Sequence, residues 1–246
     1  FHTSGISMSN INKFFWIHIK KSGGQSIRQL LQPHYALTDR SRHPECFVKD
    51  NYKYWNDILN NYRIPLGKLQ FRRAAFAKQH LYPTDWSKMY TFAFAREPIA
   101  RCLSMYRYFS NELSRLAEKR GLKFISEAAR FDFFLQIIKE TRKSKDNKGP
   151  CGLHFATHTN TMWNDITDQE GKLCLTKIYR LEDMMPALRQ VYKECGLSDE
   201  NLTKMVKINQ TAELNIHKSL GIEFQREISL LYEGDFYIYN QLYNYA

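Results

Sequence analysis

Residues 14–31, FFWIHIKKSGGQSIRQLL, contain three successive patterns that together predict one structural unit. The run at 14–19 is continuously apolar and partly β-branched, which is typical of a strand covered on both faces. The polar and glycine-containing residues at 20–24 interrupt this run, and apolar residues then recur at helical spacing. The stretch therefore predicts a strand, a tight loop and a helix in succession.

The rest of the chain continues this alternation of strands and helices. Three more strands are predicted at 71–78, 90–95 and 173–179, and helices near 98–110, 124–140 and 181–197. Pro98 stands at a helix start and Gly196 at a helix end, the positions that each residue type favours. The pattern predicts the α/β class, with a doubly wound and mostly parallel sheet.

Length and composition favour a single domain over residues 1–246, because 246 residues with 43% hydrophobic content can bury one substantial core. Residues 1–11 are expected to be flexible or foreign to the natural chain. An irregular stretch with a helix near 52–61 is predicted between the first two strands, and a polar loop at 141–152. The C-terminal third is predicted to be mainly helical.

The formal net charge of +11 indicates an anionic ligand, surface or polymer. Charge alone leaves open a merely basic protein, a nucleic acid, an acidic glycan or a nucleotide as the explanation. We rank nucleic acid last, because the chain has no helix-turn-helix or RNA-recognition signature.

The first loop, from Lys20 to Ser26, has the composition of an anion cradle. Its glycines let backbone N–H groups approach phosphate oxygens, the following helix adds a favourable dipole, and the lysines supply full charge. A turn that simply requires glycine remains an alternative. The G-x-x-x-x-G-K-[ST] pattern of common nucleotide triphosphatases is absent from the sequence.

A second motif, AREPIARCLSMY at 95–106, places Arg96 at the end of a predicted strand and Ser104 on the following helix. A fork-like guanidinium and a hydroxyl can bind a second phosphate. A surface ion pair for Arg96 and a packing hydroxyl for Ser104 are the alternatives. Glu97 is expected to support the arginine or the helix start rather than to transfer protons.

Read together, the two motifs resemble the sulfotransferases that use 3'-phosphoadenosine 5'-phosphosulfate (PAPS). IHIKKSGGQS at 17–26 is similar to their 5'-phosphosulfate loop, HIPKTGGTS, and the second motif to their 3'-phosphate segment. The nearest likeness is to the carbohydrate or Golgi-type branch that includes heparan sulfate 2-O-sulfotransferase. This chain departs from the loop pattern at Lys20, where proline is usual, and at Gln25, where threonine is usual.

The resemblance implies a P-loop-like, phosphosulfate-binding turn, PAPS as donor with PAP as product, and no metal. It implies that Lys21 contacts the 5'-phosphate or bridging oxygen, which gains charge in the reaction. The backbone of the loop would complete the cradle, and the second motif would bind the 3'-phosphate. The implied donor-binding residues are Lys21, Ser22, Gly23, Gly24, Gln25, Ser26, Arg96 and Ser104.

For the catalytic base we choose His80, which follows the predicted strand at 71–78. The carboxyl ends of parallel strands share one crevice, so His80 is expected to face the loop. Unperturbed imidazole has a pKa of about 6.5, which suits proton transfer. The placement resembles the histidine pair HGH of the 2-O-sulfotransferase branch, with Lys78 at the first position here; a lone structural histidine is the alternative.

Acceptor binding is assigned to His154 and His158, which could instead contact the adenine or be ordinary loop residues, whereas His18 is expected to be a core histidine. The acceptor is expected to carry a hydroxyl and to be a carbohydrate, and the surplus positive charge suits an anionic one. Two other functions stay open: an ATP-dependent phosphotransferase with a variant loop, and a non-catalytic protein of this fold that binds acidic glycans.

The five cysteines form no CxxC pair and predict no zinc site. Cys151 and Cys174 could form a disulfide in an oxidising compartment, or remain free thiols. No apolar run reaches the roughly 18 residues that span a bilayer. The predicted compartment is the cytoplasm if the chain is complete and the Golgi lumen if an N-terminal anchor has been removed.

Overall fold

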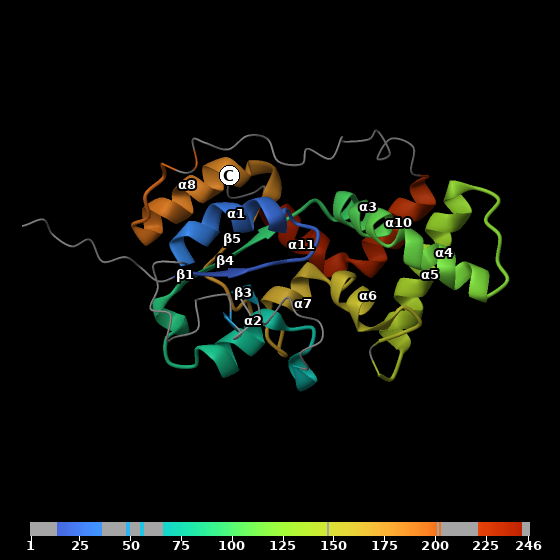
Figure 1. The fold of residues 1–246 in the computed structure, drawn as a ribbon, viewed down its shortest axis with the longest axis horizontal. Coiled ribbons are helices and arrows are strands. Elements are labelled where there is room, and N and C mark those ends of the chain that lie inside the picture. Colours follow the sequence, from blue (N-terminus) through green and yellow to red (C-terminus); the bar gives the residue numbers. More distant parts are fainter. Residues whose placement is uncertain are drawn as a thin grey trace, which may run out of the picture.

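The computed structural model describes residues 14–35, 48–49, 55–56, 66–146, 148–200, 202 and 221–242 (Figure 1). Its centre is a parallel sheet with the strand order β1-β4-β5. These strands are β1 (Phe14–Ile17), β4 (Tyr90–Ala95) and β5 (Lys177–Arg180). The α/β class and the parallel sheet predicted from the sequence are confirmed.

The register of the sheet brings the carboxyl ends of all three strands to one edge. Ile17 at the end of β1 lies opposite Ala93, and Ala95 at the end of β4 lies opposite Arg180 at the end of β5. The residues that follow each strand therefore meet at this edge. Two of the three connections, after β1 and after β4, are the sequence motifs described above.

Helices lie on both sides of the sheet, as a doubly wound fold requires. In Figure 1, α1 (Gly24–Tyr35) and α8 (Met184–Cys195) lie above it, and α2 (Arg73–Phe76) and α7 (Met162–Ile166) lie below. The hydroxyl of Tyr192 in α8 donates to the carbonyl of Leu30 in α1 at 2.7 Å. Gly196 ends α8 with a φ of 66°, the left-handed cap predicted there.

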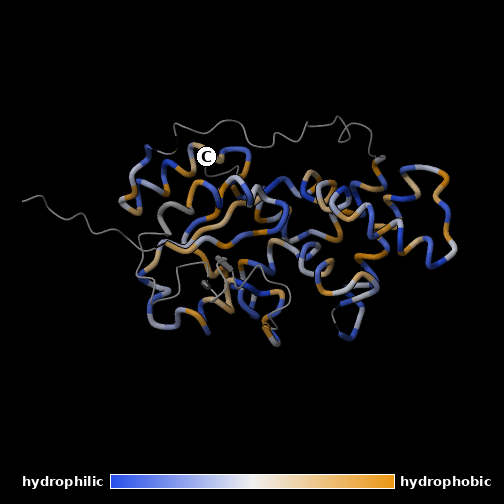
Figure 2. The backbone as a smooth tube through the Cα atoms, in the orientation of Figure 1, coloured by the Kyte–Doolittle hydropathy of each residue, from blue (hydrophilic) through white to orange (hydrophobic). Residues whose placement is uncertain are grey.

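A second group of helices extends from the strand ends and has its own apolar core. It contains α3 (Pro98–Tyr108), α4 (Ser110–Lys119), α5 (Glu127–Lys143), α6 (Gly152–His158) and α10 (Ile222–Leu231). Phe109, Phe134 and Phe155 are among its buried side chains. The last helix, α11 (Glu233–Gln241), buries Ile238 and Tyr239 in the core of the sheet and packs Phe236 against this second core. In Figure 2 hydrophobic segments run through the sheet, and hydrophobic and polar stretches alternate along these helices. The core of the sheet is a separate cluster around Phe15, Phe92 and Leu188.

The predicted strand at 71–78 is wrong, because this segment is helical. Residues 73–76 form α2, and residues 77–81 continue directly as a π-helix. Ala74, Ala75 and Ala77 are all fully buried. Alanine is the best helix former, and the segment lacks the β-branched residues that favour strands, so its apolar run reports a buried helix.

Smaller differences concern element bounds. The strand predicted at 173–179 begins only at Lys177, and Leu173 forms an isolated bridge with Thr167. Of the helix predicted near 52–61, residues 55–56 instead form β3 (Trp55–Asn56), which pairs with β2 (Val48–Lys49), and the others lie outside the described residues. Residues 1–11 also lie outside them, so the expectation for that segment and the single-domain assignment stay predictions.

The disulfide considered between Cys151 and Cys174 is not formed. Both are free thiols in the structure, as are Cys102 and Cys195. Cys46 lies outside the described residues. Burial raises the pKa of the Cys151 thiol to about 11, so this half-buried group stays protonated near neutral pH.

Candidate anion-binding and acceptor site

The loop between β1 and α1 has the backbone shape of an anion-binding concavity. Lys21 has a φ of 65° and Gly23 a φ of 71°, so two residues of the loop are left-handed. Left-handed residues between right-handed ones turn successive backbone N–H groups toward the same side of a loop. Lysine rarely adopts this conformation, and such strain is concentrated at functional sites.

The two glycines of the loop are required by close packing. A Cβ atom on Gly24 would lie 1.8 Å from Nε2 of His18, and one on Gly23 would lie 2.4 Å from Cδ1 of Leu181. The ring of His18 stacks on Trp16 at 5.1 Å, so it cannot easily move away. The loop is thereby held against the ends of β1 and β5, and the backbone N–H of Ser22 donates to the carbonyl of Ile19 at 3.3 Å.

The hydroxyl of Ser22 carries the clearest sign that the loop receives a ligand. Ser22 is only 1% exposed, yet its Oγ has no hydrogen-bond partner among the described residues. A buried hydroxyl without a partner is costly, unless a bound molecule supplies one. An oxygen-rich anion in the loop would do so, and the residues present therefore fit a phosphate or phosphosulfate group.

Positive charge converges on the same loop. Arg96, the first residue after β4, donates from Nη1 to the carbonyl of Lys21 at 3.2 Å. Burial and then the nearby Arg96 guanidinium lower the pKa of the Lys21 amine. Two cations held this close favour a bound anion, which would relieve their repulsion. The structure thus brings together the two motifs that are 75 residues apart in the sequence.

A buried arginine of the second motif fixes the loop from the helical side. Arg101 is 1% exposed and donates from Nε to the carbonyl of Lys20 at 3.0 Å. Its other nitrogens bind the Asp235 carboxylate at 3.0 Å and the Asn160 carbonyl at 2.6 Å. No role was predicted for Arg101. A charged residue at a predicted buried position of a helix is a signal for such a role, because charged side chains are buried only when they are paired.

A second buried arginine fixes the same loop from below the sheet. Arg73 in α2 donates to the carbonyl of His18 at 3.2 Å and to that of Thr157 at 3.1 Å. Its Nε lies 3.4 Å from the Asp165 carboxylate, which also accepts from Asn160. Sequence reasoning missed this residue because it placed 71–78 in a strand. With Arg101, it ties the loop to the segment 157–160.

Glu97 caps the helix that follows Arg96, one of the two roles predicted for it. Its carboxylate accepts from the backbone N–H groups of Ile99 at 3.0 Å and Ala100 at 2.6 Å. Pro98 occupies the first turn, as predicted. This cap stabilises the start of α3 and so holds Arg96 next to the loop.

The two histidines assigned to acceptor binding lie close to the loop, and Tyr108 contacts both of them and Lys21. Lys21 Nζ lies 4.3 Å from the centroid of the Tyr108 ring. That ring stacks on His158 at 5.1 Å with an interplanar angle of 12°, and its hydroxyl lies 3.4 Å from Nε2 of His154. Both histidines are in α6, and their ring centroids are 4.4 Å apart. Tyr108 was not predicted as a site residue.

His158 is held as a neutral imidazole. Its Nδ1 lies 3.0 Å from the backbone carbonyl of His154, which can only accept, so Nδ1 carries the proton and Nε2 is free to accept. Burial, the Lys20 charge and His154 lower the pKa of His158 to about 2. Burial likewise lowers the pKa of His154. His158 is thus a hydrogen-bond acceptor of very low basicity.

His80 lies in the π-helix after α2 rather than after a strand, and its side chain is exposed. Its ring packs against Phe76 with the centroids 5.0 Å apart. Arg73, at the start of this continuous helix, is hydrogen-bonded to the carbonyl of His18 in the loop. His80 follows Arg73 by seven residues, which corresponds to roughly 10 Å along the helix axis. π-helical turns are frequent at functional sites. Its assignment as base stays a prediction.

The remaining predicted donor-binding residues lie on the helices that begin at the sheet edge. Gln25 and Ser26 occupy the first turn of α1, with Gln25 exposed and Ser26 half-buried. Ser104 is half-buried on α3. His18 contacts Trp16 and Gly24, as expected for a core histidine, and burial strongly lowers the pKa of its imidazole.

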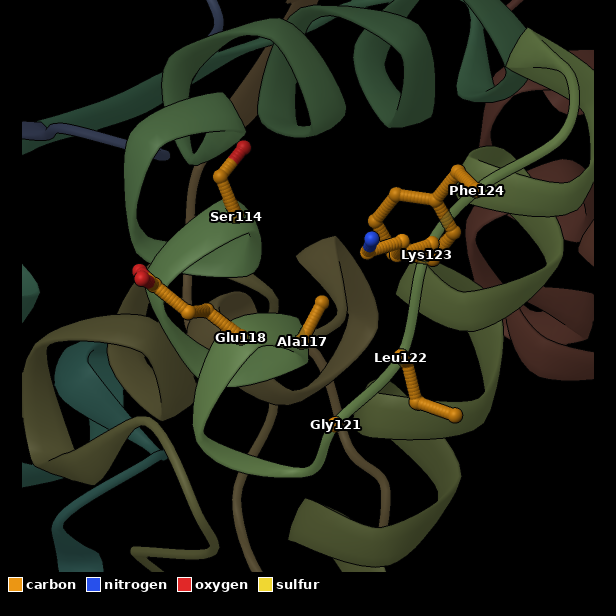
Figure 3. Close-up of a pocket in the computed structure, with 7 residues that line it drawn as sticks. All are labelled: Ser114, Ala117, Glu118, Gly121, Leu122, Lys123 and Phe124. Atoms are coloured by element: carbon orange, nitrogen blue, oxygen red, sulfur yellow. The ribbon is translucent and has the colours of Figure 1, made fainter.

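A shallow pocket elsewhere does not belong to this site. It is lined by residues of α4 and the loop after it, including Ala117, Leu122 and Phe124 (Figure 3). Its apolar walls contain none of the residues that surround the strand ends. Within the described parts of the chain, no group of three or more His, Cys, Asp or Glu side chains could hold a metal, and no helix could span a membrane.

The fold and the loop define an α/β protein whose residues at the edge of the sheet fit a phosphate-like group. The chain belongs to the sulfotransferase family, whose model matches residues 4–245. None of the curated proteins and none of the solved structures matches the chain. Membership supports sulfuryl transfer to a hydroxyl-bearing acceptor. The likeness to the heparan sulfate 2-O-sulfotransferase branch stays a prediction.

Proposed function

We propose that the protein transfers a sulfuryl group from PAPS to a hydroxyl of a carbohydrate. The observation that carries the proposal is the buried hydroxyl of Ser22, which has no hydrogen-bond partner among the described residues. It lies in a loop that contains the left-handed Lys21 and that Arg96 contacts through the Lys21 carbonyl. Sulfotransferases generally use PAPS. The residues at the strand ends supply positive charge, N–H groups and a hydroxyl for the 5'-phosphosulfate and the 3'-phosphate of PAPS.

Each residue has a separate role in the proposal. Lys21, the hydroxyl of Ser22 and the N–H groups of residues 23–26 bind the 5' end of the donor, and Lys21 stabilises charge on the leaving phosphate. Arg96 and Ser104 bind the 3'-phosphate. His80 takes the proton of the acceptor hydroxyl, since His158, with its pKa near 2, is too weak a base.

A carbohydrate acceptor is supported by the side chains beside Lys21. Tyr108 is 47% exposed, and His154 and His158 lie next to it. Neutral imidazoles beside the exposed edge of this ring offer hydrogen-bond acceptors for sugar hydroxyls. The net charge of +11 is compatible with a sugar that already bears acidic groups.

Thermal stability in the presence of nucleotides tests the donor. Adenosine 3',5'-bisphosphate should raise the melting temperature, whereas AMP and ATP at the same concentration should not, because only the first offers a 3'-phosphate to Arg96. Arg96→Met should lower the ratio of the affinity for adenosine 3',5'-bisphosphate to that for AMP at least tenfold. Arg115→Met, an exposed arginine on α4, is the matched control and should leave it unchanged.

The same measurement separates the alternatives. A larger shift with ATP and Mg²⁺ would indicate a phosphotransferase. Equal shifts with all three nucleotides would contradict PAPS as the donor. A protein that only binds acidic glycans would respond to heparin with a steep salt dependence and to none of the nucleotides.

A further inference from the structure

Tyr108 contacts three residues of the candidate site although it lies at the exposed end of α3. The Lys21 ammonium lies over its ring at 4.3 Å, its ring stacks on His158 at 5.1 Å, and its hydroxyl lies 3.4 Å from His154. The convergence of these contacts links the donor loop to α6 through one side chain.

Lys21 needs a partner that leaves its charge intact. In the described part of the chain, no carboxylate lies within ion-pair distance of its ammonium. A carboxylate there would cancel the charge that the donor requires. The face of an aromatic ring instead attracts the ammonium and leaves its net charge available for an anion.

The ring is itself fixed by a neutral neighbour. His158 donates through Nδ1 to the backbone of His154 and stays uncharged, since burial and the Lys20 charge lower its pKa to about 2. An uncharged imidazole can stack beside a lysine-bearing ring without repelling the ammonium. Phe109, the next residue, also packs on both histidines and holds the end of α3 against α6.

We propose that Tyr108 is a positioning residue that holds the Lys21 ammonium on its ring face, so that the loop meets the donor with this charge already in place. The proposal rests on the proposed function, in which Lys21 binds the 5' end of the donor. An unheld lysine side chain would have to lose its conformational freedom when the donor binds. Removal of the ring should therefore weaken donor binding, through Lys21 alone.

Calorimetric titration with adenosine 3',5'-bisphosphate at low ionic strength tests this. Tyr108→Leu should raise the dissociation constant roughly fivefold, the size expected of a partly exposed cation–π contact. Tyr108→Phe keeps the ring and should stay within about 1.5-fold of the unmodified protein. Tyr237→Leu removes another exposed tyrosine, on α11, and should change nothing. An unchanged or lowered constant for Tyr108→Leu would overturn the proposal.

A double-substitution cycle distinguishes positioning from a purely structural effect. Lys21→Met should weaken binding about tenfold, and adding Tyr108→Leu to it should weaken binding no further, because the ring acts only through the ammonium. A further fivefold loss in the double variant would contradict the positioning role. If the unmodified protein shows no preference for the 3'-phosphate over AMP, the proposed function fails as well. If it shows that preference and Tyr108→Leu has no effect, only the positioning role fails.

Discussion

The loop that follows β1, at residues 18–24, and the π-helix at 77–81 both carry residues assigned to sulfuryl transfer in the proposal, but the protein holds them in opposite ways. The loop is bound through its backbone by two buried arginines and packs its glycines against neighbouring side chains. The π-helix presents Lys78, Gln79 and His80 to solvent. The loop proposed to bind the anion is thus built into the core, whereas the proposed base lies on the surface, where an acceptor can reach it.

The largest effect is expected from the exposed side of this comparison. His80→Ala should lower sulfuryl transfer from PAPS to desulfated heparin by about 10² to 10⁴-fold, the usual contribution of a general base. Binding of adenosine 3',5'-bisphosphate should stay within twofold and the free energy of unfolding within about 0.5 kcal/mol, because the side chain is exposed. Radiolabel transfer and calorimetry measure the two quantities. Full transfer activity would remove His80 from the base role.

Substitutions at the buried arginines that hold the loop should lower the free energy of unfolding. Arg101→Met leaves the Asp235 carboxylate buried without its 3.0 Å partner and should lower the free energy of unfolding by about 3 to 5 kcal/mol. Arg120→Met, which breaks the exposed Arg120–Glu140 pair at 2.8 Å, should cost about 1 kcal/mol or less. Urea unfolding of both variants is the measurement. Equal losses of unfolding free energy in the two variants would contradict the conclusion that the buried Arg101 pair stabilises the protein more than the exposed Arg120 pair.

The smallest effect is a pH dependence that originates at His158. Its pKa is about 2 in the folded protein and near 6.5 in the unfolded chain, so below about pH 6.5 the unfolded chain takes up a proton that the folded protein does not. Acidification must therefore favour unfolding. Between pH 7 and pH 5 the protein should lose about 1 to 2 kcal/mol more stability than the His158→Gln variant. Parallel losses in urea titrations at both pH values would contradict the assignment.

Both phosphate motifs were predictable because each is local. A strand, a glycine loop and a helix follow one another within residues 14–31, and the parallel register then places Arg96 beside that loop. The strand at 71–78 failed for a physical reason. Its alanines are apolar enough to be buried in either conformation, and in the structure they pack against α7 within the same apolar core as the strands.

Tyr108 and Arg101 were missed because their roles depend on partners far away in the chain, and Arg73 was missed because residues 71–78 were placed in a strand. Arg101 binds Asp235, 134 residues away, and Tyr108 meets His154 across 46 residues. No local pattern marks such pairs. A charged residue on an apolar helix face is a partial signal for Arg101, and nothing in the sequence around Tyr108 distinguishes it from other surface tyrosines.

The sequence by itself determined the α/β class, the glycine-containing loop after the first strand and the helix that begins at Pro98, since backbone preferences and periodic burial act between near neighbours. Only the tertiary structure decided that Lys21 is left-handed, that its ammonium lies on Tyr108, and that His154 and His158 lie beside the loop. The physical reason is the sheet register together with two buried arginines, which bring segments from four parts of the chain to one edge and fix them there.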